Sequence, residues 1–363
     1  MLTTPPSNAD VPDVVADAQW LLSRLAPAPA KLEFVWLPRE DHAKVTFLTD
    51  QYLQQNQLPG VHLDLGAVQS ALSPTLPPCH YLFHSAFCCS TLMIRALDIP
   101  GSSFGLNEPQ VMIELAALQR QGKLDPQRLR LAVALLSRPF GPGEVTVVKP
   151  GNEANLLIDP LLRVDERSRG VLLYAPLSGF LRSIARKQLW GRLWARRLFL
   201  QLQRDYGLSL GFSEVQQFEQ TDLQVAALAW LHHHAQFASL LARFPDRLRA
   251  LDSDSFLAQR AHCLAAVGRH LGLAVAQERW NEVVESKVFA SHSKEIGRSF
   301  TPESETERAA EMPLIDEEIE MVVQWTKTIA EGIGLSLELP NALDAAAQKA
   351  TRLEDGSLSA PAG

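Results

Sequence analysis

The sequence predicts an α/β fold: a parallel sheet flanked by helices, with additional helical segments. Between residues 80 and 206, short apolar runs typical of strands alternate with helical patterns. This order favours parallel strands joined by right-handed crossovers. The chain has 363 residues, of which 46% are hydrophobic, enough for a large core. Ligands of such sheets bind at the carboxyl ends of strands, so polar residues that follow strands are candidate site residues.

The N-terminal residues are rich in proline and polar side chains, and we expect a flexible segment over residues 1–30. A short amphipathic helix is predicted over residues 15–25 within this segment. The α/β domain is expected over residues 31–300, beginning with a strand candidate at 32–37. An acidic linker with a C-terminal helix follows at 301–340, and a disordered tail at 341–363.

The central stretch, His80 to Asp98, is interpreted as a strand, a loop and a helix. The strand is Tyr81–Phe83, the loop runs from His84 to Cys89, and Ser90 is the predicted N-cap of the helix. Free N–H groups and the helix dipole favour an anion at such a loop. The loop has no glycine and no Gly-Lys-Ser/Thr triplet, so an ordinary strand-to-helix connection is an equally good interpretation.

The later elements follow in alternation. Pro109 is predicted to open a helix, since its missing N–H costs nothing at that position. Further elements are expected as a helix at 126–136, strands at 145–148 and 170–174, a helix at 155–162, a long helix at 178–206, a helix at 221–244, a strand at 248–252 and helices at 256–271 and 319–333. Lys149 directly follows a buried strand, where a lysine is costly to hide, which favours a functional role.

The long helix at 178–206 is rich in arginine. Arg182 and Arg186 share one face and Ser183 lies on the neighbouring one, so its first turns are a candidate phosphate site. The alternative is a solvated basic face, or pairing with the acidic residues 303–320.

Composition and motifs argue against several classes of function. A net charge of −7 gives no general basis for binding nucleic acid or anionic membranes. The four cysteines lack zinc-site spacing, and His232–His234 point in three directions on a helix, so no metal is expected. No signal peptide and no apolar run of membrane-spanning length is seen, and a cytoplasmic protein is expected.

The ordered segments resemble the sulfotransferases that use 3′-phosphoadenosine 5′-phosphosulfate (PAPS), which have a P-loop-like α/β fold. The resemblance extends from about residue 80 to residue 298, in a divergent form. The segments that resemble the family include YLFHSAFCCSTLMIRALD, FGLNEPQVM, VVKPGNEANLLIDPLL, GVLLYAPLSGFLRSIARK and FASHSK. The resemblance implies transfer of a sulfuryl group to a hydroxyl or amine of a small-molecule or carbohydrate acceptor, without a metal. A homodimer remains open.

The resemblance also implies donor-binding residues. The 5′-phosphosulfate loop would comprise Ala86, Phe87, Cys88, Cys89, Ser90 and Thr91; the 3′-phosphate site would comprise Arg182, Ser183, Arg186 and Lys294. The sequence departs from the family in both motifs. In the loop, Phe87 and Cys89 stand where a basic residue and a glycine are expected; in the 3′-phosphate motif, Tyr174 stands where an arginine is expected and Ser183 lies one place beyond the expected serine.

The resemblance places the catalytic base at Glu108 and a catalytic lysine at Lys149. An acceptor hydroxyl must lose a proton as it attacks sulfur, and a carboxylate can take it. An ammonium stabilises negative charge on the departing oxygen. Glu108 as a helix-terminal charge and Lys149 as a surface residue are the alternatives. At the level of function, the alternatives are a non-catalytic nucleotide-binding or assembly protein and a P-loop phosphotransferase.

Overall fold

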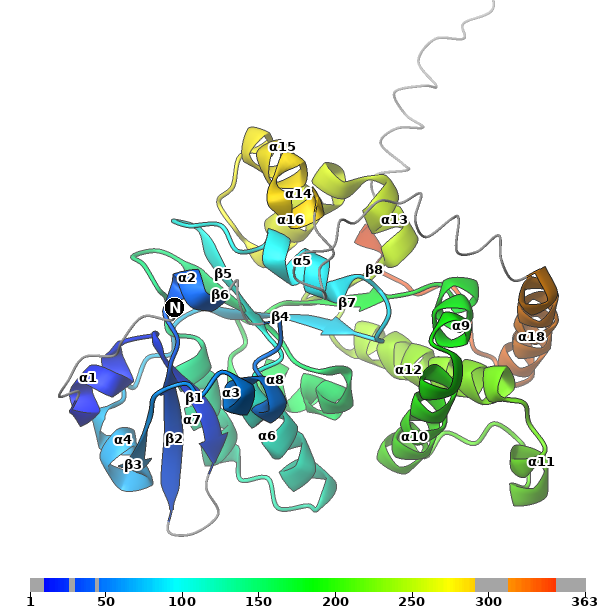
Figure 1. The fold of residues 1–363 in the computed structure, drawn as a ribbon, viewed down its shortest axis with the longest axis horizontal. Helices are drawn as coiled ribbons and strands as arrows, with labels where there is room; N and C mark the ends of the chain where they lie inside the picture. Colours follow the sequence, from blue (N-terminus) through cyan, green and yellow to red (C-terminus); the bar gives the residue numbers. More distant parts are fainter. Residues whose placement is uncertain (1–9, 26–29, 43–45, 291–312, 344–363) are drawn as a thin grey trace, which may run out of the picture. The chain divides into compact units, whose positions relative to one another are not determined.

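A computed structural model describes residues 10–25, 30–42, 46–290 and 313–343. It contains a three-stranded sheet in the order β1-β2-β3 and a five-stranded parallel sheet, flanked by helices, in the order β5-β6-β4-β7-β8 (Figure 1). The predicted α/β class with a parallel sheet is therefore confirmed. The chain is divided into two compact units. The first comprises the described residues of Met1–His84, Cys89–Gly170 and Leu271–Glu305, and the second those of Ser85–Cys88, Val171–His270 and Thr306–Gly363.

The first unit begins with the antiparallel sheet. Its elements are α1 (Val11–Ala16), β1 (Trp20–Leu25), β2 (Lys31–Trp36), α2 (Arg39–His42), α3 (Asp50–Gln55), β3 (Gly60–Asp64) and α4 (Leu65–Ala71). The helix expected over residues 15–25 is thus wrong, because α1 ends at Ala16 and Trp20–Leu25 form a strand. Trp20 pairs with Trp36 in register, and the two rings meet edge to face at 5.1 Å, so strand pairing overrides the helical pattern.

The parallel part of the first unit holds three strands. Its elements are β4 (Cys79–His84), α5 (Ser90–Ala96), β5 (Ser103–Asn107), α6 (Gln110–Arg120), α7 (Pro126–Leu136), β6 (Val145–Lys149), the 3-10 helix η1 (Asn152–Leu157), α8 (Ile158–Val164), α15 (Gln277–Glu285) and α16 (Lys287–Ala290). Both β4 and β5 pair with β6 in parallel. The sequence pattern missed β5, which is only five residues long and contains Gly105. A Cβ at Gly105 would lie 2.2 Å from the carbonyl oxygen of Ile94, so α5 requires a glycine there.

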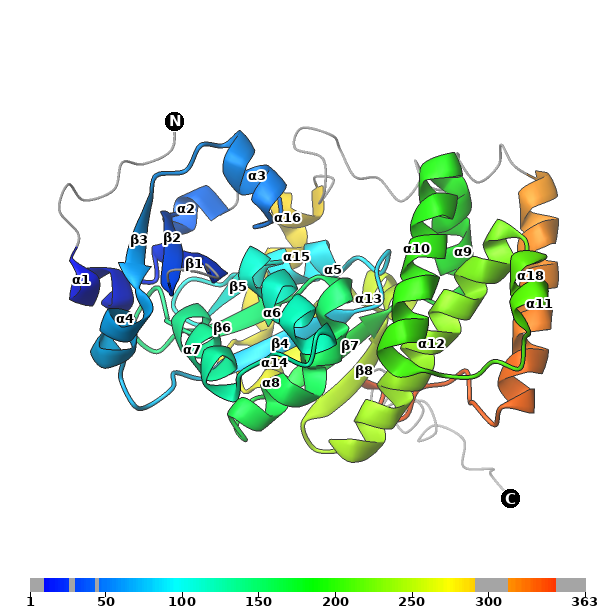
Figure 2. The same ribbon diagram turned by 90° about the horizontal axis from the view of Figure 1, so that it is seen from below.

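The second unit is mainly helical. Its elements are β7 (Gly170–Tyr174), α9 (Leu177–Arg186), α10 (Gln188–Tyr206), α11 (Glu214–Phe218), α12 (Asp222–Arg243), β8 (Leu248–Asp252), α13 (Ser253–Ala258), α14 (Arg260–Leu271) and α18 (Pro313–Gly332). The helix expected over residues 178–206 is two helices, because Gln188 adopts a φ of 49°. After this break, α10 packs along α12 (Figure 2).

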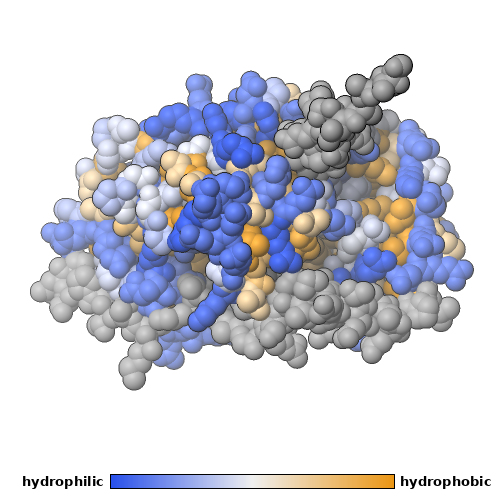
Figure 3. All heavy atoms as spheres, turned by 90° about the horizontal axis from the view of Figure 1, so that it is seen from above, coloured by the Kyte–Doolittle hydropathy of each residue, from blue (hydrophilic) through white to orange (hydrophobic). Residues whose placement is uncertain are grey.

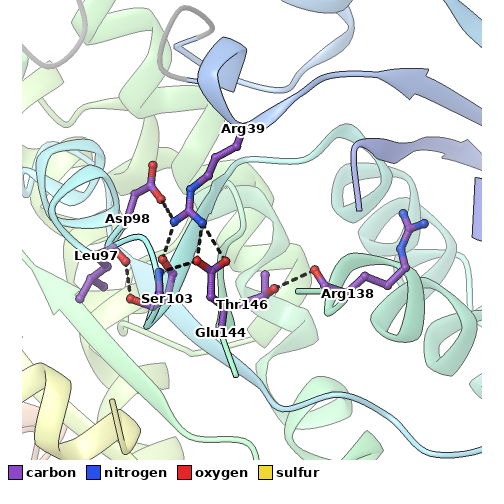
Figure 4. Close-up of polar contacts among 8 residues, drawn as sticks. Arg39, Leu97, Asp98, Ser103, Arg138, Glu144 and Thr146 are labelled. Atoms are coloured by element: carbon purple, nitrogen blue, oxygen red, sulfur yellow. Dashed lines mark hydrogen bonds and ion pairs between the residues drawn. The ribbon is translucent and has the colours of Figure 1, made fainter. Parts of the chain in front are cut away.

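Arg39 links three segments of the first unit (Figure 4). Its guanidinium donates to both carboxylate oxygens of Glu144 at 2.6 and 2.7 Å, to Asp98 at 2.5 Å and to the carbonyl oxygen of Ser103 at 2.9 Å. Glu144 also accepts from the Gly101 backbone at 2.6 Å. Burial raises the pKa of Asp98, and Arg39 opposes that rise. This network holds the amino end of β5, opposite its carboxyl end at Asn107.

Arg138 is buried directly after α7 and binds the N-terminal segment. Its guanidinium donates to the carbonyl oxygens of Val14 at 2.7 Å, Asp17 at 2.8 Å and Trp20. Burial lowers the pKa of Arg138 to about 10. These acceptors lie in the last turn of α1, at its C-cap and at the start of β1, so one side chain bonds both elements.

The surface view in Figure 3 shows a face that is largely hydrophilic, with apolar patches between the polar side chains. Among the described residues, no helix is both long enough and apolar enough to cross a membrane. No group of three or more His, Cys, Asp or Glu side chains in that same part of the chain is arranged as a metal site.

The three adjacent histidines of α12 are all buried in the second unit. His234 bonds the carbonyl oxygen of Ser336 at 3.1 Å and stacks on Trp230 at 4.3 Å. Burial lowers the pKa of His232 to about 4, of His233 to about 3 and of His234 to about 4. The histidines are therefore neutral packing residues of the helical core near pH 7.

These pKa values predict acid sensitivity. The histidine pKa is about 6.5 in an unfolded chain, above the folded values, so below pH 6.5 protons bind the unfolded state preferentially and the free energy of unfolding falls. His233→Leu should flatten this decline between pH 6.5 and 4, as measured by urea unfolding at a series of pH values. The same substitution at exposed His62 is the control. An unchanged slope in His233→Leu would contradict the prediction.

Candidate active site

Three strands of the first unit end at one edge of the parallel sheet. Their last residues are His84 in β4, Asn107 in β5 and Lys149 in β6. Asn107 and Lys149 are directly opposed in the strand register. Because parallel strands place their carboxyl ends at the same edge, polar groups from separate segments meet there.

Lys149 occupies the centre of this group, and its side chain is 0% exposed. The ammonium donates to Asn107 Oδ1 at 3.0 Å and forms an ion pair with Glu108 Oε1. Asn107 in turn donates to the carbonyl oxygen of Thr46. A buried ammonium requires such acceptors, because unpaired burial of a charge costs several kcal/mol. The structure therefore brings the two predicted catalytic residues, Glu108 and Lys149, into direct contact.

Glu108 adopts an unusual backbone conformation. Its φ is 52°, in the left-handed region that a glutamate rarely occupies. Its N–H donates to the carbonyl oxygen of Lys149 at 2.7 Å, and Pro109 follows it. The first helical residue of α6 is Gln110, with Pro109 at the N-cap and no side-chain cap bond. The carboxylate is thus directed to Lys149 rather than to the helix terminus, and strain of this kind is concentrated at functional sites.

Two further titratable residues approach the pair. His84 Nε2 lies 3.7 Å from Glu108 Oε1, and the His84 carbonyl accepts from Asn155 Nδ2 at 2.9 Å. Burial raises the pKa of Glu153; nearby Glu108 adds to the rise and Lys149 opposes it. His84, Asn107 and Glu153 were not among the predicted site residues. Two of them end strands, and that position was the available signal.

The side chains of Glu108 and Lys149 differ in their exposure to solvent. The Glu108 side chain is 18% exposed, whereas that of Lys149 is fully buried. A molecule arriving from solvent therefore meets the carboxylate before the ammonium. This arrangement suits proton abstraction from an incoming group, with a fixed positive charge behind the base.

The loop before α5 has three non-glycine residues with positive φ: Ala86 at 72°, Phe87 at 52° and Cys89 at 60°. The N-cap of α5 is Cys89, without a side-chain cap bond, and Ser90 is the first helical residue. The prediction of Ser90 as N-cap is therefore wrong by one position, because the left-handed turn at Cys89 brings the chain into the helix. A left-handed residue followed by a right-handed one, as at Cys89 and Ser90, can turn successive N–H groups toward an anion.

The remaining residues that were predicted to bind the sulfuryl donor contact other residues of the protein. The Phe87 ring packs against Phe180 at 5.9 Å and Trp194 at 4.9 Å. Cys88 and Thr91 are buried. Arg182 pairs with Asp316 at 2.9 Å, and the Ser183 hydroxyl donates to the carbonyl of Gly179 at 2.9 Å.

Arg186 is the last residue of α9 and is partly exposed. Lys294 lies outside the described residues. The alternative of pairing with the acidic residues 303–320 is realised at Arg182, whose partner is Asp316.

No protein-family model matches the chain, and no curated protein matches it. Among solved structures, the chain is similar to the "Sulfotransferase Domain from the Curacin Biosynthetic Pathway". The two share 15% identity, the match covers 73% of this chain and 99% of that one, and the TM-score is 0.40.

The strained loop predicts a stabilising substitution. A left-handed conformation costs an L-residue about 1–2 kcal/mol, and the greater freedom of unfolded glycine offsets part of this cost. Ala86→Gly should therefore raise the free energy of unfolding by about 0.5–1 kcal/mol in chemical denaturation. Ala117→Gly, in the exposed interior of α6, should instead lower it by about 1 kcal/mol. A loss of stability in both variants would refute the loop conformation.

Proposed function

We propose that this chain transfers a sulfuryl group from PAPS to a hydroxyl or amine of an acceptor. The observation that supports the proposal is the Glu108–Lys149 ion pair at the carboxyl ends of adjacent parallel strands. A carboxylate at the solvent side and an ammonium behind it are the two groups that this reaction needs.

In the proposed reaction, the acceptor oxygen or nitrogen attacks sulfur as its proton passes to Glu108. The new bond to sulfur forms while the bond from sulfur to the bridging oxygen of the donor breaks, and 3′-phosphoadenosine 5′-phosphate leaves. Protonation removes the negative charge of Glu108, so Lys149 loses its neutralising partner. Its positive charge then acts on the oxygen that gains negative charge, and the pair couples the two events.

The donor residues remain part of the proposal. Ser90 and Thr91, with the N–H groups of the residues from Ala86 to Cys89, are proposed for the 5′-phosphosulfate. Arg182, Ser183, Arg186 and Lys294 are proposed for the 3′-phosphate. A bound 3′-phosphate would compete with Asp316 for Arg182.

The base assignment predicts a selective loss of turnover. Glu108→Gln keeps the shape of the side chain but removes its ability to accept a proton, so transfer from labelled PAPS should fall by roughly 10²-fold or more. Binding of 3′-phosphoadenosine 5′-phosphate by calorimetry should stay within about twofold, because Glu108 is not a proposed donor contact. Glu278→Gln, an exposed glutamate of α15, is the matched control.

The same assays separate the alternatives. Parental turnover in Glu108→Gln would remove Glu108 as the base. Nucleotide binding without transfer to any hydroxyl or amine acceptor would indicate a non-catalytic nucleotide-binding or assembly protein. Transfer from ATP in place of PAPS would indicate a phosphotransferase.

The 3′-phosphate assignment predicts discrimination between nucleotides. 3′-Phosphoadenosine 5′-phosphate should bind more tightly than AMP, since a dianionic phosphate gains charge-assisted hydrogen bonds from arginine. The double variant Arg182→Ala, Ser183→Ala should abolish the difference in calorimetry. Equal affinities in the parental protein would leave the 3′-phosphate site without support.

A further inference from the structure

One face of α10 is exposed and chemically distinctive. It presents a row that we call the α10 stripe: Trp190, Leu193, Arg197, Leu200 and Arg204. Trp190 is 60% exposed, Leu193 47% and Leu200 49%, and Leu189 beside them is 69% exposed. Scattered apolar residues are normal on a surface, but several on one helix face mark an interaction site.

The spacing of the stripe is that of a helix-packing seam. Successive members are separated by three, four, three and four residues, the a/d pattern of a heptad repeat. At 1.5 Å per residue the stripe is about 21 Å long. A straight seam of this length and period matches one facing helix.

The four arginines of α10, together with Arg182 of α9, fall into two groups. Those directed into the second unit are paired: Arg182 with Asp316 at 2.9 Å, and Arg196 and Arg192 with Asp222 at 2.7 and 3.5 Å. Arg197 and Arg204, in the stripe, are exposed and have no acidic partner within the described part of the chain. The stripe is thus positively charged without internal compensation.

The tryptophan of the stripe is already held in place. Trp190 stacks on Trp194 with ring centroids 6.4 Å apart and planes at 16°, and Lys187 Nζ lies 5.3 Å from the Trp190 ring. An ordered indole loses little freedom on binding, and Trp and Arg are the residues enriched at binding hot spots.

We propose that the α10 stripe binds an acidic amphipathic helix of a partner protein. The partner would present apolar residues to Trp190, Leu193 and Leu200, and Glu or Asp to Arg197 and Arg204. A lipid surface fits less well, because Arg197 lies between two leucines and would be pressed into the apolar layer. A second copy fits less well, because symmetric in-register pairing sets Arg197 against Arg197, with no acid in the stripe.

Charge reversal tests the proposal. The probe is a labelled 21-residue helical peptide with leucines in the a/d pattern and glutamates at the two positions that face the arginines. A second peptide carries lysine at those two positions. Fluorescence anisotropy with the full chain should show at least tenfold tighter binding of the glutamate peptide. The double variant Arg197→Glu, Arg204→Glu should invert this preference, and Arg269→Glu, an exposed arginine of α14, should leave it unchanged.

Three other results would overturn the proposal. The first is equal binding of the two peptides, or binding that the charge reversal leaves unchanged. The second is binding to vesicles of equal parts phosphatidylcholine and phosphatidylserine, lost in Leu193→Ser, without binding of the glutamate peptide. The third is a dimer in sedimentation velocity that Leu193→Ser dissociates. The variants lie on the exposed face, and circular dichroism verifies their folding.

Discussion

The buried ammonium of Lys149 constrains the sheet edge around it. Full burial of a charge is tolerated only with well-placed acceptors, and Asn107 and Glu108 supply them from the end of the neighbouring strand. The strand register must therefore keep Asn107 opposite Lys149. A shift of one residue would turn Asn107 to the other face of the sheet and leave the ammonium without that acceptor. The strand register of the sheet is therefore the same register that supplies the buried ammonium with its acceptors.

The arginines of α9 and α10 include some that pair with acids of their own unit and others that are exposed on the surface. Asp222 and Asp316 neutralise the arginines that face their own unit, which connects α10 with α12 and α9 with α18. The arginines on the opposite side of α10 alternate with apolar residues in a helical repeat. Composition alone describes both groups as one basic run, and only the three-dimensional position distinguishes them.

The sequence predicted elements whose signals are local. Pro126–Leu136 has a proline start and a regular apolar face, and Lys149 directly follows a run of β-branched residues within β6. It could not predict β1, where six residues compatible with a helix become a strand by pairing with β2. Nor could it predict the positive φ of Glu108, because that conformation is imposed by its bond to Lys149 and by Pro109. The sequence thus identified Glu108 and Lys149 as candidates, whereas their direct ion pair is seen only in the structure.

The contacts of Arg138 make the folding of the N-terminal segment depend on a residue that is translated much later. The carbonyl groups at the end of α1 and in β1 leave the ribosome early, but the guanidinium that binds the Trp20 carbonyl lies 118 residues later. At roughly 5–20 residues per second, the N-terminal segment waits about 6–24 s for that side chain to be translated. During this interval the apolar residues of β1 have no completed core, so the exposed hydrophobic strand is open to aggregation until Arg138 has been translated.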